Sequence, residues 1–180
     1  MILIKYAIGI GLAALTLFSC SNEKSLQRYL VDRQDDDSFL KIDIAASLLQ
    51  ADSNSMTQEE KDILATVKKI NVVAFPIKGE NADNYEANKQ ELKDIINQDQ
   101  YKTLMKFGSK NKGAVLKYLG EENAINEIIV FASDDEKGFA LFRLLGDNMQ
   151  PGQMIKLMNS IENGDIDASK LKSIGSLFDM

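Results

Sequence analysis

The chain has 180 residues, of which 21 are basic and 27 are acidic, and its formal net charge at pH 7 is −6. This acidic balance argues against nonspecific binding of nucleic acid, so no nucleic-acid partner is expected. The chain has no histidine and one cysteine, which excludes a Ser-His-Asp triad, histidine-ligated zinc or haem, and an internal disulfide.

The first residues have the pattern of a cleavable signal. Lys5 is the only charged residue before Glu23, and an uncharged, mostly apolar stretch runs from Tyr6 to Phe18. As a helix this stretch would be about 20 Å long, shorter than the roughly 30 Å hydrocarbon core of a bilayer. It is therefore typical of a signal-peptide core rather than of a permanent transmembrane helix.

The signal ends in Leu17-Phe18-Ser19-Cys20, which resembles the lipobox of bacterial lipoproteins, although Phe18 is bulkier than the usual residue there. The resemblance implies cleavage between Ser19 and Cys20 and a diacylglyceryl group on the Cys20 thiol, which would hold the protein on a membrane. Two or three acyl chains would give a stable anchor, at about 0.8 kcal/mol per buried CH₂. The alternative is an ordinary secretory signal or a short anchor with an incidental cysteine.

The residues after Cys20 indicate to which membrane of the cell envelope the protein is sent. Ser21 stands where an Asp would indicate retention in the inner membrane, so the resemblance favours the outer membrane. Some lipoproteins reach the cell surface through a short acidic signal after the cysteine, and here Glu23 is the single acidic residue in that position. The periplasmic and surface faces both stay open.

Three segments follow from this pattern: a signal peptide over residues 1–19, a lipidated tether with a short helix over 20–38, and a single α+β domain over 39–180. The first half of the chain alternates helices and strands. The expected elements are a helix over Ser25–Arg33, a strand over Phe39–Ala46, a helix from the capping box Thr57-Gln58-Glu59-Glu60 to about Lys69, a strand over Asn71–Ile77 that Pro76 ends, and a helix from Asp83 or Asn84 to about Asn97.

The second half predicts four strands in succession and then two helices. The strands are Tyr101–Phe107, Ala114–Leu119, Ile125–Ser133 and Phe139–Leu145, with turns at Ser109–Gly113 and Asp134–Gly138, and the helices begin at Pro151 and near Asp167. The order β-α-β-α-β-β-β-β-α-α predicts a mixed sheet of five or six strands, with right-handed crossovers early in the chain and helices mainly on one face.

A lipobox followed by this order of elements resembles a family of small lipoproteins of unknown function from Gram-negative bacteria. The resemblance covers the whole chain and is strongest over Glu127–Leu145, where Asp134-Asp135-Glu136-Lys137-Gly138 forms the tip of a hairpin. The family has no catalytic assignment. The resemblance therefore implies lipidation at Cys20 and no further site residue.

The remaining motifs do not predict a catalytic, cofactor or metal site. Ser21/Lys24 and Ser109/Lys112 match a Ser-x-x-Lys pair, but the first lies beside the anchor and the second in a turn with solvated lysines. The acidic residues Asp134–Glu136 are expected to form a turn rather than a glycosidase pair, and neither they nor Asp35–Asp37 have the spacing of a calcium loop.

Alternation in the strand over 101–107 predicts a basic strip. If Tyr101, Thr103, Met105 and Phe107 face the helices, Lys102 and Lys106 face away, and Lys117 and Arg143 can share that outer face. These four basic residues would form a docking face for an acidic envelope protein or an anionic glycan. The simpler interpretation, which the sequence favours, is that they are solvated charges that protect the sheet from edge pairing.

Taken together, these patterns favour a membrane-anchored, non-enzymatic binding module of the cell envelope with no cofactor and an unknown ligand. A hydrolase that uses Asp, Glu, Ser or Lys is one alternative, since these residue types are present. An accessory protein of an envelope-stress response is another, and the sequence does not separate it from the binding module.

Overall fold

The computed structural model describes residues 23–47, 56–109, 111–154 and 156. Six strands form one sheet in the order β1-β2-β6-β5-β4-β3, and every neighbouring pair is antiparallel. The strands are β1 (Leu40–Ala45), β2 (Val67–Pro76), β3 (Lys102–Gly108), β4 (Lys112–Glu121), β5 (Ala124–Asp134) and β6 (Gly138–Met149). The α+β class and the strand number are confirmed, whereas the expected mixed sheet is wrong because β1 and β2 pair antiparallel.

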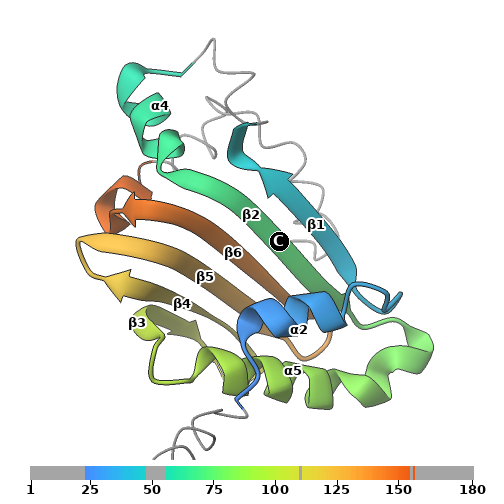
Figure 1. The fold of residues 1–180 in the computed structure, drawn as a ribbon. Coiled ribbons are helices and arrows are strands. Elements are labelled where there is room, and N and C mark those ends of the chain that lie inside the picture. The colour runs from blue at the N-terminus through green and yellow to red at the C-terminus, as the bar shows by residue number, and fades with distance from the viewer. Residues whose placement is uncertain (1–22, 48–55, 110, 155, 157–180) are drawn as a thin grey trace, which may run out of the picture.

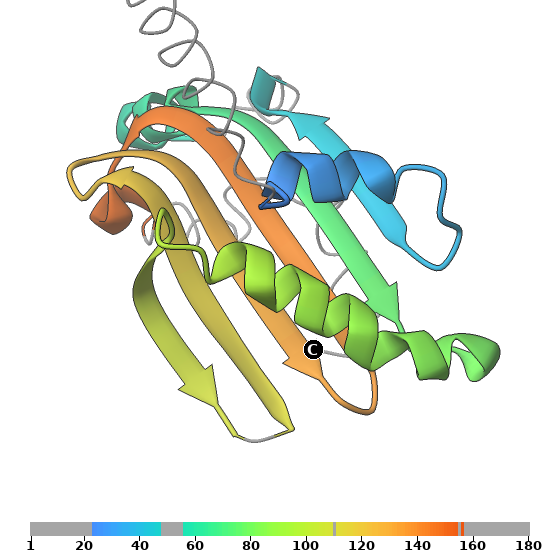
Figure 2. The ribbon, with the colours of Figure 1, turned by 60° about the horizontal axis from the view of Figure 1, so that its bottom comes forward.

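Two helices lie side by side on one face of the sheet, α2 (Leu26–Asp32) and the longer α5 (Ala82–Ile96), as Figures 1 and 2 show. Ser25 caps α2 by accepting a hydrogen bond from the backbone N–H of Arg28 (3.1 Å). A short 3₁₀ turn, η3 (Gly79–Asn81), leads into α5. The predicted stripe on α5 is confirmed, because the following side chains are buried: Tyr85, Leu92, Ile95 and Ile96.

The third helix, α4 (Gln58–Ala65), begins with the predicted capping box between Thr57 and Glu60. It ends four residues earlier than expected, at Ala65 rather than Lys69, because the β-branched run from Val67 pairs with β6 instead. Lys69 lies in β2 and forms an ion pair with Asp43 of β1 (2.8 Å). Helical conformation resumes at Pro151, and the rest of that helix and the helix near Asp167 lie outside the described residues.

The sheet has a hydrophobic core on each face. Under α2 and α5 the core is aromatic, and the ring of Phe75 stacks on that of Phe139 at 5.5 Å while Phe39 contacts both edge-on. The opposite core contains aliphatic residues from the strands and from α4, such as Ile63, Leu64 and Ile128. The side chains of the sheet therefore divide between a side that faces the two helices and a side that faces the aliphatic core.

One irregularity decides which lysines face the helices. The pairing of β3 with β4 shifts by one residue between Thr103 and Met105, which is a β-bulge. Because of the bulge, Thr103 and Lys106 share the helix side, where Lys106 lies opposite Val115 of the aromatic core. Met105 and Phe107 turn to the other side and stay 53% and 61% exposed, so the expected alternation of β3 is wrong.

Candidate functional site: a lysine-lined groove

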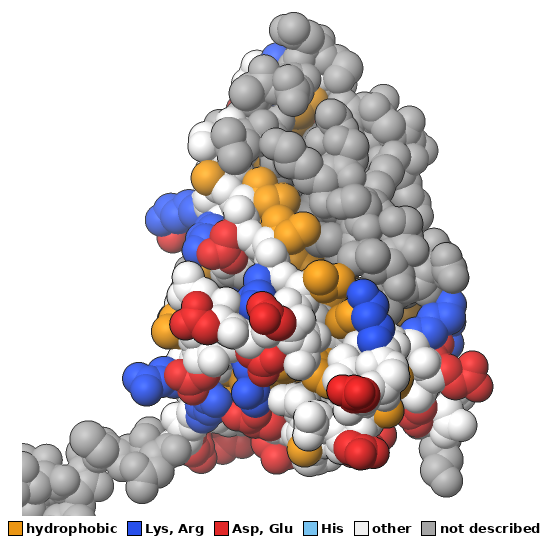
Figure 3. All heavy atoms as spheres, turned by 90° about the vertical axis from the view of Figure 1, so that its right-hand side faces the viewer, with side chains coloured by type: hydrophobic (Ala, Val, Ile, Leu, Met, Phe, Trp, Pro, Cys, Tyr) orange, Lys and Arg blue, Asp and Glu red, His pale blue; other side chains and the backbone are white. Residues whose placement is uncertain are grey.

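A groove of about 510 Å³ runs between α5 and the strands β3 and β4. Its walls carry five lysines and one carboxylate, in a chain whose net charge is −6. The polar and charged lining residues are Lys89, Lys93, Asn97, Thr103, Lys106, Ser109, Lys112, Lys117, Ser133 and Asp135. By contrast, on the side of the molecule in Figure 3 acidic and basic side chains alternate over the described surface. We call the first feature the lysine groove.

Two of its lysines have carboxylate partners. Lys89 donates to Asp135 (2.8 Å) and to Glu86 (2.6 Å), and the Tyr85 hydroxyl also donates to Asp135 (3.0 Å). Burial opposes the charge of Lys89, but these hydrogen bonds outweigh burial and raise its pKa. The same bonds, first from Lys89 and then from Tyr85, lower the pKa of Asp135. Lys112 forms an ion pair with Asp134 (3.5 Å).

Lys117 differs from Lys89 although both residues are only 6% exposed. Within the described part of the chain, the side chain of Lys117 makes no hydrogen bond and no ion pair. Burial, and after it the charge of nearby Lys106, lower the pKa of Lys117. The groove therefore holds a buried cation whose charge is opposed by that of a second cation, Lys106.

The register explains why Lys117 lies under the helices. Strand pairing aligns one residue from each strand in a row across the helix side of the sheet: Asp43, Asn71, Arg143, Ile129, Lys117 and Thr103. Along β4, Lys117 alternates with Leu116 and Tyr118, which belong to the opposite core. Its position under α5 is therefore set by the pleat and not by its charge.

Arg143 lies in the same row but is fully paired. Its guanidinium donates to both carboxylate oxygens of Glu127 (2.9 and 3.0 Å) and to the side-chain carbonyl of Gln27 in α2 (2.7 Å). We call Arg143, Glu127 and Gln27 the arginine cluster. Tyr101 lies beside it, and burial, followed by the charge of Glu127, raises the pKa of Tyr101 to about 12. The cluster joins α2 to β5 and β6.

The structure does not bring the four predicted basic residues together on an outer face. Lys106, Lys117 and Arg143 lie on the helix side, because the β3 bulge and the strand register turn them there. Lys102 lies on the other side, where it donates to the carbonyl of Gly120 (3.3 Å) and covers the ring of Tyr118. Two of the four, Lys106 and Lys117, therefore meet in the lysine groove.

The other motifs take the places expected of turns. Ser109 Oγ donates to the backbone carbonyl of Lys112 (3.4 Å) while the Lys112 ammonium faces Asp134, so the two do not form a nucleophile–base pair. The Asp134 carboxylate accepts the backbone N–H groups of Glu136 (3.0 Å) and Lys137 (3.3 Å). In the described ranges no three His, Cys, Asp or Glu side chains gather where they could hold a metal ion.

A second hollow lies on the opposite face of the sheet. Register aligns four alanines across adjacent strands, namely Ala74, Ala140, Ala132 and Ala114, and the row ends at the exposed Phe107. Three of these alanines, Ala140, Ala132 and Ala114, line a cavity of about 400 Å³, to which Gly113 and Gly138 also contribute.

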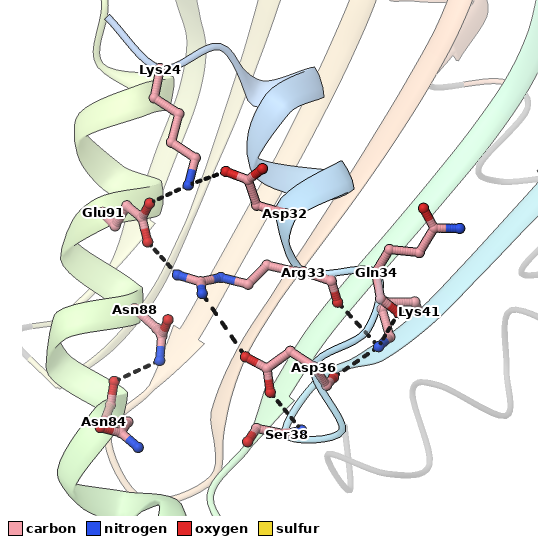
Figure 4. A network of polar contacts seen from close by, with 10 residues as sticks. All are labelled: Lys24, Asp32, Arg33, Gln34, Asp36, Ser38, Lys41, Asn84, Asn88 and Glu91. Atoms are coloured by element: carbon pink, nitrogen blue, oxygen red, sulfur yellow. Dashed lines mark hydrogen bonds and ion pairs between the residues drawn. The ribbon is translucent and has the colours of Figure 1, made fainter.

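Charged side chains fix α2 to α5, as Figure 4 shows. Glu91 of α5 accepts hydrogen bonds from Lys24 (2.7 Å) and Arg33 (2.5 Å), and the two cations also lie over the ring of Tyr29. The carbonyl of Lys24 accepts a further hydrogen bond from Gln98 (3.0 Å). We call this set the Lys24 clamp, because it holds the start of the described chain against α5.

Comparisons with known proteins give one match. The family described as Domain of unknown function (DUF4252) matches residues 29–157, which include the whole sheet and the lysine groove. No curated protein and no solved structure matches the chain. No helix in the part of the chain that the structure describes is long and apolar enough to cross a membrane. Cys20 and Ser19 lie outside the described residues.

Proposed function

We propose, from the premise that the chain belongs to the DUF4252 family of unknown function, that it is a non-enzymatic binding module held on a membrane of the cell envelope by lipid on Cys20. The lysine groove is its binding surface. The partner is an anionic molecule of the envelope, either an acidic protein surface or an anionic glycan.

The observation that carries this proposal is the charge of the groove. Five lysines face one carboxylate there, and that carboxylate, Asp135, is already bound by Lys89 and Tyr85. Lys106 and Lys117 make no ion pair within the described residues. Concentrated charge of one sign in a concave site attracts ligands of the opposite sign.

The lipid anchor is supported by the signal pattern that ends at Cys20 and by its single cysteine. Cys20→Ala should abolish metabolic labelling with a radioactive or alkyne-bearing fatty acid and leave an uncleaved precursor on a gel. Labelling that persists in this variant would rule out Cys20 as the site.

Photo-crosslinking in cells tests the binding surface. A photoreactive residue replaces Asn97, an exposed residue that lines the groove, and in a second strain it replaces Gln90, an exposed residue of α5 outside the groove. We expect a discrete crosslinked product from position 97 only, and its loss on Lys106→Glu. Mass spectrometry and glycan staining of that product distinguish an acidic protein from a glycan. Equal products from both positions, or a product that survives charge reversal, would contradict the proposal.

A further inference from the structure

We infer that the end of the lysine groove formed by Lys117, Lys106 and Thr103 is a specific site for a doubly charged phosphate group, as inorganic phosphate or as the phosphomonoester of a larger molecule. This inference rests on the part of the proposed function that makes the lysine groove a binding surface for an anionic molecule, and it names the chemical group bound there. Lys106 and Lys117 differ from Lys89 and Lys112 of the same groove because they lack carboxylate partners within the described residues.

The sheet holds the three side chains around one position. Thr103 and Lys117 are directly opposite each other in the pairing of β3 with β4, so their Cβ atoms lie about 5 Å apart. Lys106 lies opposite Val115, two residues along β4 from Lys117 and on the same face. It reaches that face because of the β3 bulge, and bulges commonly re-aim a side chain in this way. Two ammonium groups and a hydroxyl therefore border one space.

The protein itself does not neutralise the two charges. A buried ammonium without a partner is strongly disfavoured, and a like charge nearby adds to the penalty. Lys117 has both disadvantages, since the residue is only 6% exposed and Lys106 is close enough to lower its pKa. The nearest carboxylate in the groove, Asp135, is occupied by Lys89 and Tyr85.

The charge of the missing partner follows from the charge of the site. A carboxylate would balance one of the two lysines, whereas a phosphomonoester carries about −1.5 to −2 at pH 7 and three acceptor oxygens. Those oxygens match two ammonium donors and the Thr103 hydroxyl. Lysine is a common phosphate ligand because it acts as a point charge without the fixed fork of arginine.

Calorimetric titration of the full mature chain with inorganic phosphate, and separately with glycerol 3-phosphate, tests the site near neutral pH. Both should bind saturably, whereas acetate at equal ionic strength should not compete. Lys117→Met and Lys106→Met should each weaken binding by about tenfold or more, which is roughly 1.4 kcal/mol each. Lys102→Met is the matched control, because Lys102 is a β3 lysine on the opposite side of the sheet, and it should leave the affinity unchanged.

Vesicle flotation separates the two sources of phosphate. Vesicles that contain phosphatidic acid present a phosphomonoester headgroup, and vesicles of phosphatidylcholine alone do not. If the protein floats with the vesicles only when phosphatidic acid and Lys117 are both present, the site binds a lipid headgroup. If the protein binds soluble phosphate in the titration but does not float with the vesicles, the site binds a soluble ligand.

Two results would overturn the inference: no saturable binding of any phosphate probe, or an equal loss in Lys102→Met and Lys117→Met. Thr103→Val, which changes no charge, keeps the test decisive if a lysine variant fails to fold. The proposed function would survive either result if the crosslinked product from position 97 still depends on Lys106.

Discussion

Arg143 and Lys117 occupy one row of the same sheet, separated by Ile129, and both are 6% exposed. Arg143 has a bidentate carboxylate and an amide carbonyl, whereas Lys117 has neither. The arginine cluster is therefore complete without any other molecule. The comparison teaches that burial alone does not mark a functional cation, and that the state of its partners separates a structural charge from a candidate ligand site.

The largest loss of stability should come from a substitution in the arginine cluster. Arg143→Met leaves the Glu127 carboxylate buried without its partner, and such a loss costs about 3–5 kcal/mol of unfolding free energy. Urea denaturation followed by circular dichroism measures it. The double variant with Glu127→Met should recover most of the loss, and a double variant as unstable as the single one would show that the ion pair is not the cause.

At Lys117, whose side chain has no carboxylate partner, we expect a substitution to raise the free energy of unfolding rather than to lower it. Lys117→Met removes a buried charge and keeps a long apolar stem, so the ligand-free protein should gain on the order of 1 kcal/mol of unfolding free energy. The same urea titration measures this gain. Lys89→Met, a lysine of equal burial with two carboxylates, should instead lose stability. A loss in both variants would show that Lys117 has a favourable interaction at rest.

The two lysines should also differ in pH dependence. The pKa of Lys117 is lowered in the folded state, so the unfolded chain binds more protons between that pKa and the ordinary 10.5, and stability rises with pH in this window. The pKa of Lys89 is raised, so its contribution is present below 10.5 and is lost as pH rises through the folded value. The stability gap between wild type and Lys117→Met should narrow from neutral to alkaline pH.

Lys89→Met also removes the hydrogen bond that lowers the pKa of Asp135, so the variants are compared from neutral to alkaline pH, far above the ordinary pKa of a carboxyl group. The gap for Lys89→Met should stay constant up to about 10.5 and shrink only above it. If the stability gaps of the two variants changed with pH in the same way, the two lysines would not differ in their partners.

The smallest effect is expected at the Lys24 clamp. Glu91→Gln removes the charge that Lys24 and Arg33 share, but all three side chains are partly exposed and water screens the pair. Exposed pairs of this kind contribute about 0.2–1 kcal/mol. Thermal unfolding should show a small decrease in Tm. A decrease as large as that of Arg143→Met would show that the clamp contributes as much to stability as the buried arginine cluster.

Much of the fold was accessible from the sequence because strand and turn patterns are local. The turn at Asp134–Gly138 was predicted, and this turn fixes the hairpin register that places Arg143 opposite Ile129 and diagonal to Glu127. The pairing of Arg143 with Glu127 was not predicted, because Arg143 was expected on an exposed basic face. The full antiparallel pairing was missed because strand order depends on contacts that are distant along the chain.

The lysine groove was accessible only in part. Lys117 shares one side of β4 with Val115 and Leu119, and strand alternation therefore places it on an apolar face. Lys106 was misplaced because a bulge adds one residue to β3 without a glycine or proline to mark it. The contribution of α5 to the groove, through Lys89 and Lys93, depends on the packing angle of a helix on the sheet, which periodicity does not determine.

The Lys24 clamp has a consequence for where the protein can work. Lys24 is four residue steps from Cys20, so a lipid on Cys20 would leave the clamped end of the domain within about 14 Å of the lipid headgroups. Asn97, which lines the lysine groove, also borders the hollow beside Ser25 at that end. The protein would then sample a thin layer next to the bilayer, where a surface-bound phosphate is far more concentrated than one in bulk solution.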